Sequence, residues 1–140
     1  IWQIELIDAG SLRLTVDMDV EEETVLEIEQ TNLMLLSGYK KWIARPGNEG
    51  VYPDEFTYEY DILPFRFWQG RLSPAGIMAS GDSLASVLFQ CTLQDESLRS
   101  IIENTDYLYK ARLLQYQRTH GAKVLPGRYR YFAGVIKIAD

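Results

Sequence analysis

The sequence has little of the residue types on which many enzymes and metal proteins depend. Among its 140 residues there is one cysteine, Cys91, and one histidine, His120. A lone cysteine excludes a disulfide within the chain, and one cysteine with one histidine excludes a structural zinc site built from four nitrogen or sulfur ligands. The unpaired Cys91 favours a reducing compartment, and we therefore expect a cytoplasmic protein.

Long apolar runs and glycine-rich phosphate loops are missing as well. No apolar stretch approaches the ~20 residues that a transmembrane helix needs, so we expect no membrane partner. Neither common glycine-rich nucleotide-binding pattern is present, and we expect no cofactor. The chain begins at Ile1 rather than Met, which favours processing or excision from a longer protein.

The remaining composition is that of a single folded domain. A chain of 140 residues can bury roughly 70% of its unfolded surface in one core. An aromatic content of 12% favours either β-rich packing or an interaction surface, because tyrosine and tryptophan combine a large apolar area with a polar tip. We therefore treat residues 1–140 as one domain.

The net charge of −6 conceals an asymmetry along the chain. Residues 1–63 carry fourteen acidic and four basic side chains, whereas residues 64–140 carry six acidic and ten basic ones. Two interpretations stay open. The two halves neutralise each other within the fold, or they form an acidic and a basic surface suited to docking.

Alternation of apolar and polar residues predicts strands at both ends of the chain. Residues 1–7 and 12–20 alternate on either side of the turn sequence Asp8-Ala9-Gly10-Ser11, which predicts a β-hairpin. Residues 128–138 are rich in aromatic and β-branched residues and predict a closing strand.

The stretch 54–68 is the one around which we expect the rest of the chain to pack. Apolar and polar residues alternate from Phe56 to Ile62, the period-2 pattern of a strand with one face on the core. The aromatic character resumes after Pro64, which predicts a central hairpin arm or one long bent strand. Proline and glycine residues predict loops on either side, over residues 46–53 and 69–80.

Apolar residues spaced by three and four positions predict helices in between. Residues 21–45 begin with three glutamates, which suit the positive end of a helix dipole, and carry an amphipathic stripe. The alternative there is a strand over Thr24–Gln30, which contains β-branched residues. Residues 82–93 and 95–120 show the same helical spacing. Together these patterns predict an α+β domain, with an antiparallel or mixed sheet and two or three helices packed on one face.

One short motif resembles the nucleophile block of the GDSL esterases and lipases. Residues 81–84 spell that block, and the resemblance implies that Ser83 is a nucleophile that attacks an ester. The late Asp-x-x-His of that family is missing here, because Gln117 stands three residues before His120. The alternative is that Asp82 or Ser83 caps a following helix.

Four carboxylates on and beside the central stretch form a candidate metal site: Asp54, Glu55, Glu59 and Asp61. Clustered carboxylates bind Mg²⁺ or Ca²⁺ through oxygen and can support a metal-dependent hydrolase or nuclease. The lysine that a nuclease signature places two residues after its second acid is missing. The alternative is the solvated face of an amphipathic strand.

Basic and aromatic residues alternate in the closing strand, as Arg128, Tyr129, Arg130 and Tyr131. Such a stretch can bind a phosphate backbone and stack on bases, so nucleic-acid binding is one hypothesis. The net negative charge of the chain opposes it. We instead expect the two arginines to pair with acids of the first half, and the two tyrosines to pack or to contact a partner.

Each candidate catalytic site lacks a group that its chemistry requires. The sequence therefore favours a non-enzymatic protein-interaction or assembly module, such as a subunit of a multi-protein or phage-type assembly or a small adaptor. We expect a protein partner or self-association, with residues 128–131 and Trp68 as contacts. Contacts between complementary charges weaken with salt, whereas an interface built from Trp2, Trp42 or Trp68 persists. Metal-dependent hydrolysis and nucleic-acid binding remain the alternatives.

Overall fold

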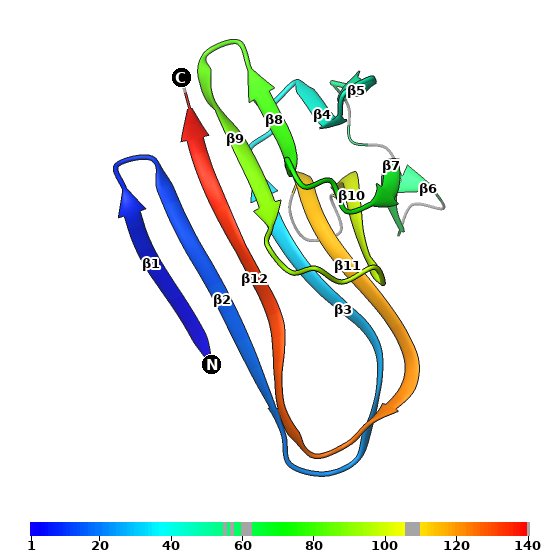
Figure 1. Cartoon of the computed structure of the whole chain (residues 1–140). Coiled ribbons are helices and arrows are strands. Elements are labelled where there is room, and N and C mark those ends of the chain that lie inside the picture. The colour runs from blue at the N-terminus through cyan, green and yellow to red at the C-terminus, as the bar shows by residue number, and fades with distance from the viewer. Residues whose placement is uncertain (55, 57, 60–62, 106–109, 140) are drawn as a thin grey trace.

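Two antiparallel sheets make up the described part of the chain, which comprises residues 1–54, 56, 58, 59, 63–105 and 110–139 of a computed structural model (Figure 1). The strands are β1 (Trp2–Asp8), β2 (Ser11–Val20), β3 (Thr24–Leu35), β4 (Lys41–Arg45), β5 (Asn48–Val51), β6 (Tyr58–Glu59), β7 (Leu63–Arg71), β8 (Ile77–Gly81), β9 (Leu84–Cys91), β10 (Leu98–Thr105), β11 (Ala111–Val124) and β12 (Gly127–Ala139). The larger sheet has the order β1-β2-β12-β9-β8-β4-β5, and the smaller sheet has the order β3-β11-β10-β7-β6.

The predicted α+β fold is wrong, because the described residues form strands and turns and no helix. The segment 21–45 forms β3 and β4, so the alternative of a strand over Thr24–Gln30 is the correct one. The segment 82–93 contains β9, and the segment 95–120 contains β10 and most of β11. None of the described residues belongs to a helix long and apolar enough to cross a membrane.

The predicted loops are also partly wrong. The segment 46–53 contains β5, and the segment 69–80 contains the end of β7 and most of β8. Proline and glycine in these segments do mark turns, but the turns are short and strands begin directly beside them. Gly76, for example, has a φ of 85° at the turn that precedes β8.

The predicted terminal strands are confirmed. β1 and β2 form an antiparallel hairpin in which Trp2 lies opposite Val16 and Leu6 opposite Leu12. β12 covers the predicted closing strand and lies between β2 and β9. The predicted central strand is not central: β6 and β7 pair as a hairpin at one edge of the smaller sheet, and part of it (residues 55, 57 and 60–62) lies outside the described residues.

An aromatic cluster joins the two sheets at the centre of the sandwich. Tyr116 of β11 contacts Phe89 of β9 and Phe132 of β12, with ring centroids 4.9 and 5.9 Å apart. Its hydroxyl donates a hydrogen bond of 2.7 Å to the Phe89 carbonyl oxygen. All three side chains are fully buried, so the polar tip of Tyr116 is satisfied inside the core.

A folded ribbon connects the sheets at one end of the molecule. β2 and β12 pair in the larger sheet up to the pair of Val20 and Gly127. Just beyond this point, β2 leads into β3, and β11 leads into β12. β3 and β11 pair with each other in the smaller sheet, starting at Thr24 and Val124. Figure 1 shows both connections at the same end. β1 lies outside β2, so the larger sheet extends beyond this ribbon to an edge of its own.

Candidate functional site

β1 is an edge strand whose side chains are all exposed. Trp2, Ile4 and Leu6 are 70%, 69% and 70% exposed. Alternate residues of a strand lie on one face of the sheet. Trp2, Ile4 and Leu6 therefore lie on the same face as the β2 residues opposite them, and one of these, Val16, belongs to the core. The face that forms the core in the middle of the larger sheet therefore continues, uncovered, to its edge.

The backbone groups of these three residues point toward the free edge. Ile1 and Asp17 exchange both of their backbone hydrogen bonds, with nitrogen-to-oxygen distances of 2.6 and 2.9 Å. In an antiparallel ladder such pairs alternate with pairs that make no hydrogen bond to each other. Trp2, Ile4 and Leu6 occupy positions that make no hydrogen bond to β2. Their N–H and C=O groups are therefore directed away from β2, toward the free edge of the sheet.

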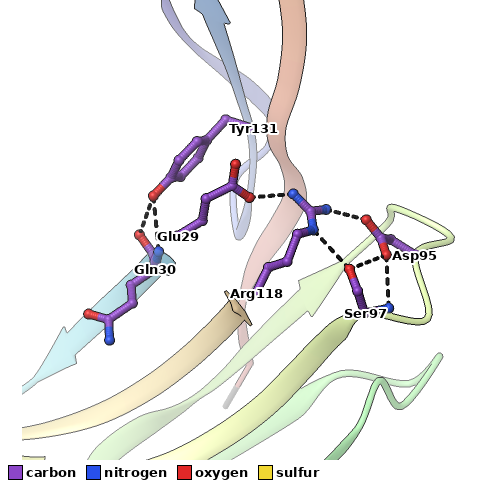
Figure 2. A network of polar contacts seen from close by, with 6 residues as sticks. All are labelled: Glu29, Gln30, Asp95, Ser97, Arg118 and Tyr131. Atoms are coloured by element: carbon purple, nitrogen blue, oxygen red, sulfur yellow. Dashed lines mark hydrogen bonds and ion pairs between the residues drawn. The ribbon is translucent and has the colours of Figure 1, made fainter. Parts of the chain in front are cut away.

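As far as the described residues show, each of the other sheet edges is short or is already engaged at one position within the chain. β5 has four residues and β6 has two within the described part of the chain, and short edge strands pair poorly with another chain. β3 is long, but the Tyr131 hydroxyl accepts a hydrogen bond of 3.0 Å from the Gln30 N–H and donates one of 3.2 Å to the Gln30 carbonyl (Figure 2). β1 is seven residues long and contains neither lysine nor proline, the residues that commonly protect an edge.

A groove of about 600 Å³ lies beside β1 and is lined by both sheets. Trp2 and Val16 line it from the larger sheet, and Leu33 lines it from β3. Gln30 and Tyr131 contribute polar groups that already bond each other. The groove therefore adds accessible apolar surface next to the exposed edge.

A buried arginine fixes the position of β3 beside this groove (Figure 2). The Arg118 guanidinium donates from Nη1 to Glu29 on β3, from Nη2 to Asp95, and from Nε to the Ser97 hydroxyl at 3.1 Å. Desolvation alone would raise the pKa of Asp95, but hydrogen bonds from Ser97 and the charge of Arg118 hold that pKa below its ordinary value. The network ties β3 and β11 to the segment between β9 and β10.

The predicted contact residues of the closing strand are largely engaged within the chain. Arg128 donates to both carboxylate oxygens of Asp19 at 2.6 and 3.0 Å, and Arg130 donates to Asp17 at 2.5 Å. The expectation that these arginines pair with acids of the first half is therefore confirmed. The Tyr129 hydroxyl donates to a backbone carbonyl at 2.8 Å, and Tyr131 bonds Gln30 as described.

The three tryptophans differ in accessibility. Trp42 is buried in the core, and Trp68 is half-buried with its ring against Gly70. Trp2 is the exposed one, at 70%. Of the tryptophans that the sequence offers for an apolar interface, the geometry favours Trp2, whereas Trp68 contributes mainly to the packing of the smaller sheet.

The structure describes only part of the candidate metal site. Asp54 is exposed and pairs with the Lys40 ammonium at 2.8 Å, which lowers its pKa through the hydrogen bond and the charge. Glu55 and Asp61 lie outside the described residues, and Glu59 is described only as backbone of β6. Among the described residues, no group of three histidine, cysteine, aspartate or glutamate side chains could hold a metal ion.

The GDSL sequence forms a turn. Asp82 and Ser83 are the two exposed residues that connect β8 to β9, and no helix follows them to be capped. His120 belongs to β11 of the other sheet. A tight hairpin turn differs from the strand-to-helix setting in which an esterase presents its nucleophile, so the resemblance does not extend to this local structure.

A second buried arginine is a feature that the sequence patterns did not indicate. Arg112 is fully buried and donates to the Asn104 side-chain oxygen at 2.8 Å and to the Pro53 carbonyl at 2.6 Å. Its guanidinium carbon lies 5.0 Å from the Tyr52 ring centroid and 4.3 Å from that of Phe56. Among the described residues, two oxygens and two aromatic faces surround this guanidinium, and Asp54 adds a favourable charge. β10 and the segment between β5 and β6 supply these groups, which are distant from Arg112 in sequence, so no local motif reveals them.

Comparison of the chain with protein-family models, with curated proteins and with solved structures found no match. The interpretation of this site therefore depends on its geometry alone. Sequence reasoning named Trp2 as one of three possible interface tryptophans and missed the edge position of β1. The available signal was that apolar residues in residues 1–7 exceed those of one face, because Ile1 and Ile7 flank the alternating stretch from Trp2 to Leu6.

Proposed function

We propose that the chain is a protein-assembly module that contacts another protein chain through the β1 edge. The observation that carries the proposal is the long edge strand with three large apolar side chains about 70% exposed and with its backbone groups directed outward. Folded proteins usually shorten, cover or charge such edges, because an open edge pairs with other chains. Added strands gain affinity from main-chain hydrogen bonds and specificity from alternate side chains.

Apolar burial supports this contact more strongly than charge does. Covering Trp2, Ile4 and Leu6 is worth roughly 1–2 kcal/mol for each side chain, since each is already partly buried. In contrast, basic side chains of residues 64–140 are largely paired within the chain. Arg128 pairs with Asp19, and Arg130 pairs with Asp17. We therefore expect an association that persists at high salt. The proposal keeps the cytoplasmic location, in line with the buried free thiol of Cys91.

Light scattering after size exclusion tests the proposal over a range of concentrations at low and high salt. We expect a mass above the 16.1 kDa of one chain at both salts, and a mass close to one chain for Trp2→Ser. Val51→Ser is the matched control, because Val51 is 68% exposed on β5 at the opposite edge of the same sheet. A single-chain mass at every concentration would refute the proposal, as would an association unaffected by Trp2→Ser.

A further inference from the structure

We propose that the chain bound at this edge is a second copy, paired antiparallel β1 to β1 with Ile4 on the two-fold axis. This inference rests on the proposed function and adds the partner and the register. It follows from three observations on residues 1–7: the symmetry of their sequence, the direction of their backbone groups and the position of their one charge.

The sequence of β1 is symmetric in polarity about its middle residue. Residues 1–7 are Ile-Trp-Gln-Ile-Glu-Leu-Ile. An antiparallel pair centred on Ile4 places Ile1 opposite Ile7, Trp2 opposite Leu6, and Gln3 opposite Glu5. Every apolar side chain then meets an apolar one, and every polar side chain meets a polar one. A two-fold contact requires this self-complementarity, because the same patch serves both partners.

The backbone groups suit the same register. In an antiparallel pair, residues directly opposite each other alternate between hydrogen-bonded and non-bonded positions. Ile4 directs its N–H and C=O outward, so Ile4 and its copy can exchange two hydrogen bonds across the axis. Trp2 and Leu6 also direct their backbone groups outward, and each would exchange two bonds with the other residue of the second copy.

Other registers are less favourable for specific reasons. A shift by one residue moves the apolar set of one copy to the opposite face of the sheet. A shift by two in one direction places Glu5 opposite Glu5 of the second copy, and like charges directly opposite destabilise a pair. A shift by two in the other direction places the apolar Ile1 opposite the charged Glu5 of the second copy. The Ile4-centred register avoids all three costs.

The pairing also defines a closed assembly. Residues directly opposite in an antiparallel pair share a face, so the axis is perpendicular to the sheet and the two larger sheets become one continuous sheet. Both smaller sheets then lie on the same side of it, with Trp2, Ile4 and Leu6 of both copies between them. The contact uses the β1 edge of each copy, so growth through this edge stops at two chains.

Single-cysteine cross-linking tests the register directly. In a hydrogen-bonded antiparallel pair the Cα atoms are roughly 5.5 Å apart, within disulfide range. We expect Ile4→Cys to form a linked dimer under mild oxidation, seen on a non-reducing gel. Gln3→Cys is the matched control, because in this register Gln3 lies opposite Glu5 of the second copy. The two Gln3 Cα atoms are therefore offset by two residues along the strands and would be about 8 Å apart. Buried Cys91 is present in every variant, so the parent chain measures its background.

Charge complementation provides a second test that needs no cross-link. Ile4→Lys and Ile4→Glu each place like charges opposite each other at the axis, so each alone should have the mass of one chain. An equimolar mixture should recover a dimer that contains one chain of each. A mixture that stays at single-chain mass, or an Ile4→Cys chain that links no more than Gln3→Cys, would overturn the register.

The outcomes separate this inference from the proposed function. Suppose that the parent chain associates and that Trp2→Ser abolishes the association, but that both Ile4 tests fail. The proposed function then stands, and the Ile4-centred pair is overturned. A parent mass clearly above two chains overturns the closed two-fold assembly. A parent chain of single-chain mass at every concentration overturns both.

Discussion

Replacing Arg118 with methionine should be among the most destabilising changes outside the aromatic core. Arg118 is nearly buried, with 11% of its side chain exposed, and its guanidinium bonds Glu29, Asp95 and Ser97. Methionine has a similar length and retains the apolar part of the side chain, so the change removes the charge and the hydrogen bonds with little loss of volume.

The magnitude follows from the different burial of the two carboxylates. The Glu29 side chain is 6% exposed, so without Arg118 its charge has little access to water. Removing one partner of a buried ion pair costs about 3–5 kcal/mol. The Asp95 side chain is 34% exposed and adds at most about 1 kcal/mol, because water can replace part of its contact. For a chain of this length, a loss of 3–5 kcal/mol corresponds to a fall in melting temperature of about 10–17 °C.

Thermal and urea unfolding at pH 7 measure this loss, and a double variant tests its cause. If the loss of the Arg118 charge beside the buried Glu29 carboxylate is responsible, Arg118→Met combined with Glu29→Gln should recover at least about 2 kcal/mol. The matched control is Arg128→Met, which breaks the exposed pair with Asp19 and should cost far less than Arg118→Met, because water can replace the contact. A cost below 1 kcal/mol for Arg118→Met, or a double variant no more stable than the single one, would refute the reasoning.

Two further predictions concern single polar groups. Tyr131→Phe removes both hydrogen bonds to Gln30, so we expect the free energy of unfolding measured in urea to fall by about 1 kcal/mol. The Gln30 amide proton should also exchange faster with solvent. An unchanged exchange rate would contradict the engagement of the β3 edge by Tyr131. Burial raises the pKa of Glu103, against the opposing effects of Arg66 and Gln115, so the folded state binds this proton more tightly than the unfolded state. The free energy of unfolding therefore falls as the pH rises from the ordinary value of 4.5 to the raised pKa, and Glu103→Gln should remove that part of the pH dependence; an unchanged pH profile would contradict it.

The sequence predicted strands where one face of a strand is buried and the other is exposed or polar. The alternation in residues 1–20 predicts a hairpin, and the structure confirms it. β10 and β11 bury side chains on both faces: Ile101 and Ile102 are fully buried, as is Leu114, and Leu113 is nearly so. Consecutive buried residues remove the period of two and fit helical spacing equally well, so the helix predicted over 95–120 was an error of pattern ambiguity.

The helix predicted over residues 21–45 failed for a different reason. Three glutamates followed by apolar residues at helical spacing are a local preference, and such a preference is weak compared with tertiary contacts. In the fold, β3 pairs with β11 along most of its length, from Thr24 to Leu35. Glutamates in and just before β3 are accommodated because β11 carries Arg118, which pairs with Glu29, and Lys123, which pairs with Glu23.

The candidate site could be predicted only in part. Trp2 was identified as a possible interface residue, but its exposure depends on the fact that the smaller sheet does not cover β1. Which strand forms an edge is a property of the whole sheet order, and a single sequence does not reveal that order. The symmetry of residues 1–7, in contrast, is visible in the sequence and has meaning only once β1 is known to be an edge.

The charge asymmetry along the chain helps to specify strand register. The acidic strands β2 and β3 pair with the basic strands β12 and β11, and opposite charges occupy directly opposite positions: Asp17 with Arg130, Asp19 with Arg128, and Glu29 with Arg118. A shift of the strand register by two residues would separate the two charges of each pair. A shift by one residue would place them on opposite faces of the sheet. The Asp17–Arg130 and Asp19–Arg128 pairs involve exposed arginines and add little stability, so their main effect is to disfavour wrong registers. Because these charges act within the chain, our proposal places the contact with another chain at the apolar β1 edge rather than at a charged surface.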